Sequence, residues 1–425
     1  MQEAFLHYIW QYKKMAVVNL NTTQFEALEI VSVGQYNTNS GPDFFNARLK
    51  IGEQLWAGNV EIHINSSDWF VHNHETDQAY DNVILHVVWE HDTDVFRKDN
   101  SIVPTLVLKE VIDKEIYINY IKLMSNHKKW INCEVDFAEV DNFIIENWLE
   151  RLYFERLERK SKTIEKLLKE SKNNWEAVLF KMLAKNFGLK VNGEAFFSMA
   201  NSLDYSIIRK LQENSMALEA LFFGQVGLLE GDIQESYYLN LQKEYVFLKQ
   251  KFQLDSAPVT SIQFFRLRPP NFPTIRLSQL ATLYSFRINL FSEIIELSTR
   301  KEFYELFKVG VSSFWESHYT FGKTSKSSSK KIAKPFIDLL LINTIIPIKF
   351  AYAKYQGKDI NENLMELIQQ IPSEKNNIVS AFNNLKKVSH SAMQSQALIQ
   401  LKTEYCDKNK CLECAIGNAL IVSKK

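Results

Sequence analysis

The pattern of apolar residues changes near residue 125, and this change limits the folds open to the chain. Before it, short apolar runs are separated by turn residues, which is typical of β-strands. After it, apolar residues recur with a helical period over long segments. These segments are 141–170, 174–187, 205–221, 236–254, 277–299, 334–355 and 376–401. We therefore expect an α/β domain over 1–125 and a mostly α-helical domain over 126–425.

The first 125 residues predict a definite order of elements. Runs that alternate or stay apolar over four to eight residues indicate strands, and Gly52 marks a hairpin between two of them. In chain order we expect a helix over 3–14, strands over 27–37, 43–51 and 54–64, a loop and helix over 66–80, and strands over 82–92 and 102–111. The predicted core is therefore helix, three strands, helix, strand.

Charge is distributed unevenly, although 50 Lys and Arg balance 50 Asp and Glu over the whole chain. Residues 1–125 contain 9 basic and 17 acidic side chains, a net charge of −8, together with six of the nine histidines. The remainder carries +8. Acidic groups and imidazoles are therefore concentrated in the first domain, and the basic helical domain could bind a phosphate backbone.

Two carboxylates in GPDFFNARL (41–49) and GNVEIH (58–63) are the leading catalytic candidates. Asp43 precedes one predicted strand, and Glu61 and His63 share a face of the next because strand side chains alternate. Carboxylate oxygens suit Mg²⁺ or Mn²⁺. We expect Asp43 and Glu61 to hold the metal and His63 to orient or activate water.

This arrangement resembles the signature of the PD-(D/E)xK nuclease superfamily. Pro42 and Asp43 match its PD element, and Glu61-Ile62-His63 stands in place of (D/E)xK, with histidine where lysine is usual. The resemblance implies a restriction-endonuclease-like α-β-β-β-α-β core and metal-dependent hydrolysis of phosphodiesters. Glu3, on the first helix, is a further candidate acidic ligand.

A second polar group follows directly in the chain. Its members form the pattern D-x3-H-x-H-x2-D: Asp68, His72, His74 and Asp77. They can complete the cleft beside Asp43 and Glu61, or they can form a separate transition-metal site. His86, in the following strand, is expected to be an ordinary hydrogen-bonded histidine.

The cysteines form a C-terminal group with one distant member. Cys406, Cys411 and Cys414 have C-x4-C-x2-C spacing, and Cys133 could supply a fourth thiolate. Zinc or an iron–sulfur cluster fits four thiolates, and reduced core cysteines are the alternative. Cysteine usage and the lack of a secretory pattern at the start favour a cytoplasmic protein.

The motif RLRPPNFPTIR (266–276) offers arginines beside rigid prolines. Arg266, Arg268 and Arg276 can contact phosphates of nucleic acid, with DNA as the expected partner, or pair with acidic helices inside the protein. The most apolar stretch, 336–353, is interrupted by polar residues and proline. We expect it to be a buried helix, and we expect no membrane partner.

Over its full length the chain resembles an uncharacterised bacterial family, domain of unknown function 2851. The motifs that carry this resemblance are GPDFFNARL, WAGNVEIHINSSDWFVHNH, YDNVILHVVWEHD, RLRPPNFPTIRLSQLA, LINTIIP and CxxxxCLECAIG. The family implies no activity, so the expected function, a Mg²⁺- or Mn²⁺-dependent nuclease, depends on the residues themselves. The alternatives are an inactive nucleic-acid-binding or assembly protein of the same fold, and a His/carboxylate metalloenzyme acting on a small molecule.

Overall fold

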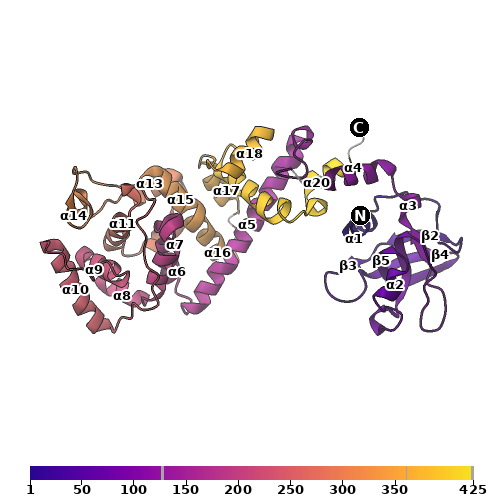
Figure 1. The fold of residues 1–425 in the computed structure, drawn as a ribbon, viewed down its shortest axis with the longest axis horizontal. Helices are drawn as coiled ribbons and strands as arrows, with labels where there is room; N and C mark the ends of the chain where they lie inside the picture. Colours follow the sequence, from indigo (N-terminus) through magenta and orange to yellow (C-terminus); the bar gives the residue numbers. More distant parts are fainter. Residues whose placement is uncertain (126–128, 360, 423–425) are drawn as a thin grey trace. The chain divides into compact units, whose positions relative to one another are not determined.

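A sheet unit and a helical unit make up the chain, and the computed structural model describes residues 1–125, 129–359 and 361–422 (Figure 1). The sheet unit comprises Met1–Trp148, Ala381–Val388 and Ile399–Lys425, and the helical unit comprises Leu149–Ser380 and Ser389–Leu398. An N-terminal α/β part followed by a mostly helical part was predicted, and the structure confirms this order, with a mixed sheet in the N-terminal part.

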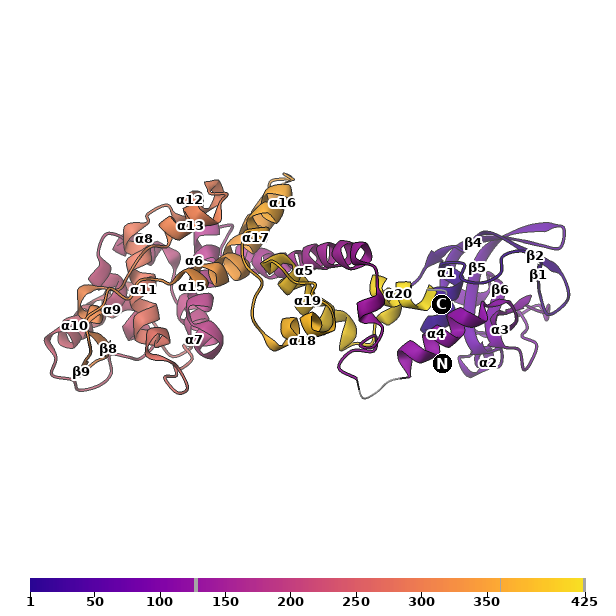
Figure 2. The ribbon, with the colours of Figure 1, turned by 90° about the horizontal axis from the view of Figure 1, so that it is seen from above.

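The C-terminal segment does not lie where the expected division at 125/126 placed it. It packs with the sheet unit, where helix α20 (Ala415–Val422) lies beside α4 (Lys114–Met124) (Figure 2). Ile421 is fully buried in the same core as Tyr120, and its carbonyl accepts a hydrogen bond from Asn119 Nδ2. This burial could not be read from helical periodicity, which does not say which neighbour a helix packs against.

The strands predicted over 43–51, 54–64 and 82–92 are confirmed, the strand predicted over 27–37 is two strands in the structure, and a short strand over 20–21 was not predicted. The remaining elements of the unit are α1 (Glu3–Gln11), β1 (Leu20–Asn21), β2 (Ala27–Ser32), β3 (Gln35–Tyr36), β4 (Phe44–Ile51), β5 (Gln54–Asn65), α2 (Asp68–Val71), η1 (Gln78–Tyr80), β6 (Val83–Glu90), β7 (Thr105–Val107), α3 (Leu108–Val111), η2 (Phe137–Glu139), η5 (Leu401–Cys406) and η6 (Cys411–Glu413). The expected strand over 102–111 is shorter, because a helical turn begins at Leu108.

The sheet is mixed, with strand order β1-β2-β4-β5-β6-β7 and β3 added beside β4. Neighbours from β1 to β5 are antiparallel, whereas β6 runs parallel to both β5 and β7. Gly52 adopts φ +58° in the turn between β4 and β5, a conformation that favours glycine. Gly58 lets β6 approach closely, since a Cβ there would lie 2.6 Å from the carbonyl oxygen of Asn82.

Side chains of β5 point alternately to the hydrophobic core and to the candidate site. Val60 and Ile62 are buried in the hydrophobic core together with Phe5 and Ile9 of α1. Glu61 and His63 therefore point to the opposite face, and His86 stands beside Glu61 in the parallel register. The connection from β5 to β6, which carries α2 and η1, supplies Trp69 to a second, smaller core.

The helical unit contains short helices and one small hairpin. Its elements are α6 (Trp175–Phe187), α7 (Leu189–Asn201), α8 (Tyr205–Leu211), α9 (Ser215–Gln225), α10 (Ser236–Phe252), η3 (Pro269–Asn271), α11 (Pro273–Phe286), α12 (Leu290–Glu296), α13 (Arg300–Leu306), α14 (Ser313–Glu316), β8 (His318–Thr320), β9 (Lys323–Thr324), α15 (Lys334–Leu340), η4 (Leu341–Ile345), α16 (Ile346–Tyr355) and α17 (Asn361–Gln369), while α5 (Asn142–Glu170), α18 (Asn377–Leu385) and α19 (Ala392–Gln400) cross its boundaries.

Three predicted helices are each two helices in the structure. The helix expected over 205–221 breaks at residues 212–214, where Asn214 caps α9 by accepting from the amide of Ala217. The segments 277–299 and 376–401 each contain two helices as well. Periodicity continues across such breaks because both helices bury apolar residues.

The most apolar segment forms a continuous helical run, Lys334–Tyr355, built from α15, η4 and α16. By length and composition this run could cross a membrane, but 78% of its most apolar window is buried inside the protein. This matches the buried helix predicted from its polar interruptions.

Candidate functional site

Asp43 and Glu61 meet at the start of β4 and the middle of β5. The amide of Asp43 donates to Glu61 Oε2 (3.1 Å), and Asp43 Oδ2 accepts from the amide of Ile62 (3.0 Å). The pairing of Phe44 with Val60 in the antiparallel ladder produces this arrangement. The two carboxyl groups predicted to act together are therefore neighbours.

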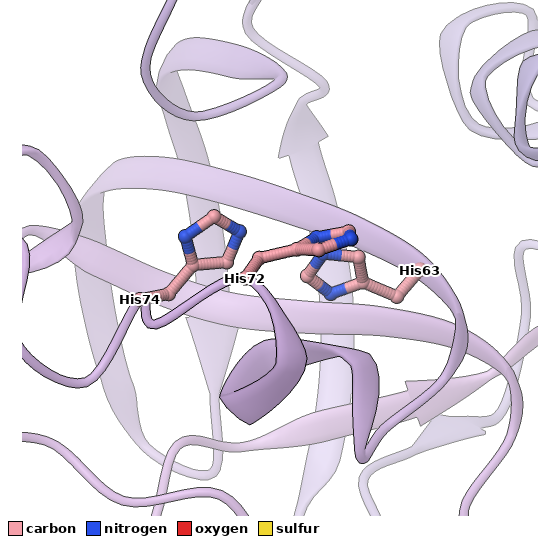
Figure 3. Close-up of side chains that lie close together, drawn as sticks. All are labelled: His63, His72 and His74. Atoms are coloured by element: carbon pink, nitrogen blue, oxygen red, sulfur yellow. The ribbon is translucent and has the colours of Figure 1, made fainter.

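Two imidazole nitrogens lie close to the other oxygen of Glu61, and the side chains of His63, His72 and His74 are grouped together (Figure 3). Glu61 Oε1 lies 3.5 Å from His63 Nε2 and 3.3 Å from His74 Nε2. His72 Nδ1 lies 3.1 Å from His63 Nε2. One ligand atom from each of His63, His72 and His74 lies within 4.8 Å of the others.

These separations match a set of ligands around one cation. Metal–nitrogen bonds of 2.0–2.1 Å place neighbouring ligand atoms about 3.0–3.4 Å apart in octahedral or tetrahedral geometry. Glu61 Oε1 and His74 Nε2 (3.3 Å) and the His63 and His72 nitrogens (3.1 Å) have this spacing, and Glu61 Oε1 and His63 Nε2 are slightly farther apart at 3.5 Å. The donor set, one carboxylate oxygen and up to three nitrogens, suits Mn²⁺ or Zn²⁺ better than Mg²⁺, which prefers oxygen.

Two buried ring nitrogens beside the carboxyl groups have no hydrogen-bond partner in the described part of the chain. Within the described residues, the buried atoms His7 Nε2 and His74 Nε2 make no hydrogen bond, although a carboxylate oxygen lies 3.3 Å from each. Those oxygens belong to Asp43 and Glu61, respectively. Buried polar atoms are normally satisfied, so unpaired nitrogens beside carboxylates fit a position for a cation.

Burial favours the neutral form of three imidazoles at the site: His63, His74 and His86. Burial, and then the neighbouring His86, lowers the pKa of His63 to about 2. Burial lowers the pKa of His86 to about 3 and also lowers the pKa of His74. Neutral imidazole has a free lone pair, which is the form that binds metals.

The carboxyl groups repel one another in the absence of a cation. Burial, and then the nearby Asp43, raises the pKa of Glu61 well above its ordinary value. Burial and Asp43 also raise the pKa of Glu3. Acidic groups placed this closely are stabilised as anions when a positive charge is bound between them.

A chain of three imidazoles leads from the interior to the surface. His86 Nε2 lies 2.8 Å from His63 Nδ1, and His63 Nε2 lies 3.1 Å from Nδ1 of the exposed His72. His86 was expected to be an ordinary hydrogen-bonded histidine, and it is hydrogen-bonded, but its partner is a site residue.

Asp68 and Asp77, the other candidates of the D-x3-H-x-H-x2-D pattern, accept hydrogen bonds from backbone amides. Asp68 accepts from the amide of Asn65 (2.9 Å) at the start of α2. Asp77 caps η1 by accepting from the amide of Ala79 (2.9 Å). Both therefore shape the loop that carries His72 and His74.

His7 is the site residue that the sequence analysis did not single out. Its Nε2 lies 3.3 Å from Asp43 Oδ2, and its Nδ1 lies 3.3 Å from the hydroxyl of Tyr36. His7 follows Glu3 by four positions, and residues so spaced share one helix face. That spacing was the available signal.

A pocket of about 210 Å³ opens beside His74. Tyr80, Arg97 and Lys98 also line it. Tyr80 stacks on His74 with a centroid distance of 3.7 Å. The lining also includes Glu75, Asp81 and Asp99, so the pocket has aromatic rings and charged side chains of both signs next to the candidate metal ligands.

The arginines of RLRPPNFPTIR differ in their surroundings. Arg266 and Arg268 are exposed. Arg276 is buried, donates to Asn271 Oδ1 (2.7 Å) and Gln279 Oε1 (2.9 Å), and lies 3.7 Å from the ring centroid of Phe336. Internal packing accounts for Arg276, so its position does not support the expected contact with nucleic acid.

The four cysteines come together in the sheet unit. They are free thiols and line a common cavity: Cys133, Cys406, Cys411 and Cys414. Their predicted convergence is therefore a feature of the structure, separate from the His/carboxylate group.

Comparisons with known proteins identify the family but no activity. Neither the curated proteins nor the solved structures contain a match to this chain. A family model described as protein of unknown function (DUF2851) matches residues 3–377, which include the whole His/carboxylate group. The chain belongs to the DUF2851 family.

Proposed function

We propose that the protein is a metal-dependent nuclease that hydrolyses phosphodiester bonds at the His/carboxylate site. The observation that carries the proposal is the convergence of Glu61 Oε1 with imidazole nitrogens at ligand spacing, beside the Asp43 carboxylate. A divalent cation held there supplies a Lewis acid for the phosphoryl group and lowers the pKa of an attacking water.

The order and direction of the strands support a restriction-endonuclease-like core. Helix α1 precedes the antiparallel strands β2, β4 and β5, and a crossover then leads to β6, which is parallel to β5. This is the helix, three strands, helix, strand order predicted from the sequence. The helix of the crossover is short, since α2 has four residues.

Mn²⁺ is the proposed metal because the ligands are mixed. Glu61 and Asp43 offer oxygen, while His63 and His74 offer nitrogen. Mn²⁺ accepts both kinds of ligand and serves in phosphodiester hydrolysis. Mg²⁺ remains compatible with the two carboxylates alone.

His63 occupies the position where lysine is usual, so it cannot have the same chemical role as lysine. His63 is neutral and cannot serve as a permanent cation. It can bind the metal through Nε2, or, when Nε2 carries the proton, orient a water molecule or donate to His72 Nδ1 at 3.1 Å, and the two roles of Nε2 exclude each other. Arg97 and Lys98 line the adjoining pocket, but Arg97 donates to the carbonyl oxygens of Val83 and Ile102 and Lys98 pairs with Asp81, so the proposal assigns them no phosphate contact.

The test is cleavage of single- and double-stranded DNA and RNA by the full chain with Mn²⁺, Mg²⁺ or Zn²⁺. We expect Mn²⁺-dependent cleavage that Glu61→Gln and Asp43→Asn reduce at least about 100-fold. Glu53→Gln is the matched control, because Glu53 is an exposed glutamate at the turn before β5. Substrate binding without cleavage in the unmutated protein would overturn the proposal and favour an inactive nucleic-acid-binding protein.

A second candidate is a transition-metal hydrolase that acts on small molecules. The three clustered histidines favour it, because an imidazole-rich set is typical of Zn²⁺. This function predicts one tightly bound Zn²⁺ per chain that is lost in His72→Ala and retained in Asp43→Asn. It also predicts hydrolysis of small phosphate or acyl esters without cleavage of nucleic acid.

A further inference from the structure

The pocket beside His74 adjoins the proposed metal position. Nε2 of His74 lies 3.3 Å from Glu61 Oε1, and the same residue lines the pocket. The volume of the pocket is about 210 Å³. Sites for drug-sized ligands usually measure about 300–1,000 Å³, so this pocket fits a smaller group, of the size of one nucleobase.

Aromatic rings form part of the wall of this pocket. Trp69 is 2% exposed and belongs to the small core of the β5–β6 connection. Tyr80 stacks on His74, with ring centroids 3.7 Å apart and ring planes 20° apart. Phe96 also lines the pocket and is 41% exposed to solvent. A planar base can therefore stack on a ring here, as bases do in proteins that bind single strands.

Most of the charged side chains that line the pocket have partners within the protein. Arg97 donates to two backbone carbonyls. Lys98 pairs with Asp81 at 3.1 Å. Asp99 accepts from the amide and the hydroxyl of Ser101, at 2.9 Å and 2.6 Å. These groups shape the walls of the pocket, and their internal contacts make them poor candidates for the main contacts of a ligand.

Glu75 is the exception among these charged side chains. It follows His74 directly in the chain and is half-buried. Among the residues that the structure describes, Glu75 Oε2 and Trp69 Nε1 are buried and make no hydrogen bond. Buried polar atoms are normally paired. An unpaired acceptor and an unpaired donor on residues that line one pocket point to a ligand that offers a donor and an acceptor in return.

We propose that this pocket holds one base of the nucleic-acid substrate, and that Glu75 selects guanine. This inference rests on the proposed function, since the base would belong to a nucleotide beside the cleaved phosphodiester. Guanine presents N1–H and its amino group side by side, and both can donate to one carboxylate, which accepts only. Guanine O6, next to N1, is an acceptor for the Trp69 indole N–H.

The other bases match the pocket less well. Adenine and cytosine present one amino group beside an acceptor nitrogen, which a carboxylate repels. Thymine and uracil have no amino group. The edge of guanine that carries N1–H is paired in a duplex, so the substrate is a single strand or a nucleotide turned out of the stack.

Mapping of the cleavage positions tests the proposal. The full chain with Mn²⁺ is given single-stranded DNA of random sequence, and the product ends are sequenced. At one fixed position next to the cut, we expect guanine to exceed thymine at least about 10-fold, and Glu75→Gln to reduce this ratio below about 3-fold. Glu53→Gln, at an exposed glutamate outside the pocket, should keep it. Cleavage without a base preference, or a guanine preference that Glu75→Gln leaves unchanged, would overturn the guanine site and leave the nuclease proposal intact.

Nucleotide binding is a second measurement that does not require cleavage. Guanosine and thymidine monophosphate are titrated separately into the full chain by calorimetry. We expect guanosine monophosphate to bind at least about 10-fold more tightly, and Glu75→Gln and Phe96→Ala each to weaken its binding about 10-fold. Selective binding in a protein that cleaves nothing would support the guanine site and reject the nuclease. Equal binding of the two nucleotides would overturn the guanine site, whatever the cleavage result.

Discussion

Asp43 and Glu61 are joined by a direct hydrogen bond in which the amide of one residue donates to the carboxylate of the other. A second hydrogen bond runs in the opposite direction between the strands, because the amide of Ile62 donates to Asp43 Oδ2. The backbone of two adjacent strands thus fixes both carboxyl groups at one point of the sheet. Burial lowers the pKa of His63, so this imidazole stays neutral and adds no positive charge, whereas a bound cation would stabilise the two carboxyl groups as anions.

Glu61→Gln should separate metal binding from folding. Burial favours the protonated form of Glu61 in the metal-free protein, because its pKa is raised, and glutamine is a neutral residue of the same shape. The metal-free variant should keep its free energy of unfolding within about 1 kcal/mol. Mn²⁺ at about 100 times its dissociation constant should stabilise the unmutated protein by about 2.7 kcal/mol and should not stabilise the variant. Equal stabilisation of both by Mn²⁺, measured by thermal unfolding, would contradict the assignment of Glu61 as a ligand.

The metal-free sheet unit should lose stability in mild acid. His63 and His86 have pKa values lowered from 6.5 to about 2 and about 3, so below pH 6.5 the unfolded chain binds protons that the folded chain does not. Each contributes a loss of about 1.4 kcal/mol per pH unit, and Glu61, whose pKa is raised, offsets one of the two between pH 6.5 and 4.5. The net loss should be about 1.4 kcal/mol per unit.

Hydrogen exchange, corrected for the intrinsic effect of pH, measures this loss. Amides of β5 and β6 should exchange faster as the pH falls from 6.5 to 4.5, while amides of α11 in the helical unit serve as the internal reference. Protection in β5 and β6 that stays constant or rises over this range would show that the buried histidines are not held neutral.

Arg276→Ala should destabilise the helical unit. The change removes hydrogen bonds to Asn271 and Gln279 and the stacking on Phe336. We expect a loss of about 3 kcal/mol in the free energy of unfolding, from denaturant titration. Arg276→Lys should recover only part of it, because lysine lacks the planar fork that reaches both partners. A loss below about 0.5 kcal/mol for Arg276→Ala would contradict the structural role.

Arg266 and Arg268 should affect binding and not stability. Both are exposed, so alanine substitutions should change the free energy of unfolding by less than about 0.5 kcal/mol. If they contact phosphates of duplex DNA, each substitution should reduce the slope of log affinity against log salt by about 0.9. The exposed Arg209 provides the control substitution. If the affinity for DNA and its salt dependence stay unchanged, these arginines do not contact the DNA.

Sequence patterns predicted the sheet unit well where the local signal was strong. The hairpin at Gly52, the strand that carries Glu61 and the buried strand β6 were all expected from turn residues and apolar runs. The breaks inside helical segments were missed, since a cap such as Asn214 is a single polar residue within a continuous apolar period. The convergence of His7 with Asp43 depends on how α1 packs on the sheet, which no local pattern encodes.

In the proposed function, Glu61 and the clustered histidines hold one divalent cation. An anomalous difference map from crystals grown with Mn²⁺ tests this directly. We expect a peak within about 2.3 Å of Glu61 Oε1 and of imidazole nitrogens from His63 and His74. A map with no peak there, or with manganese bound only elsewhere on the protein, would contradict it.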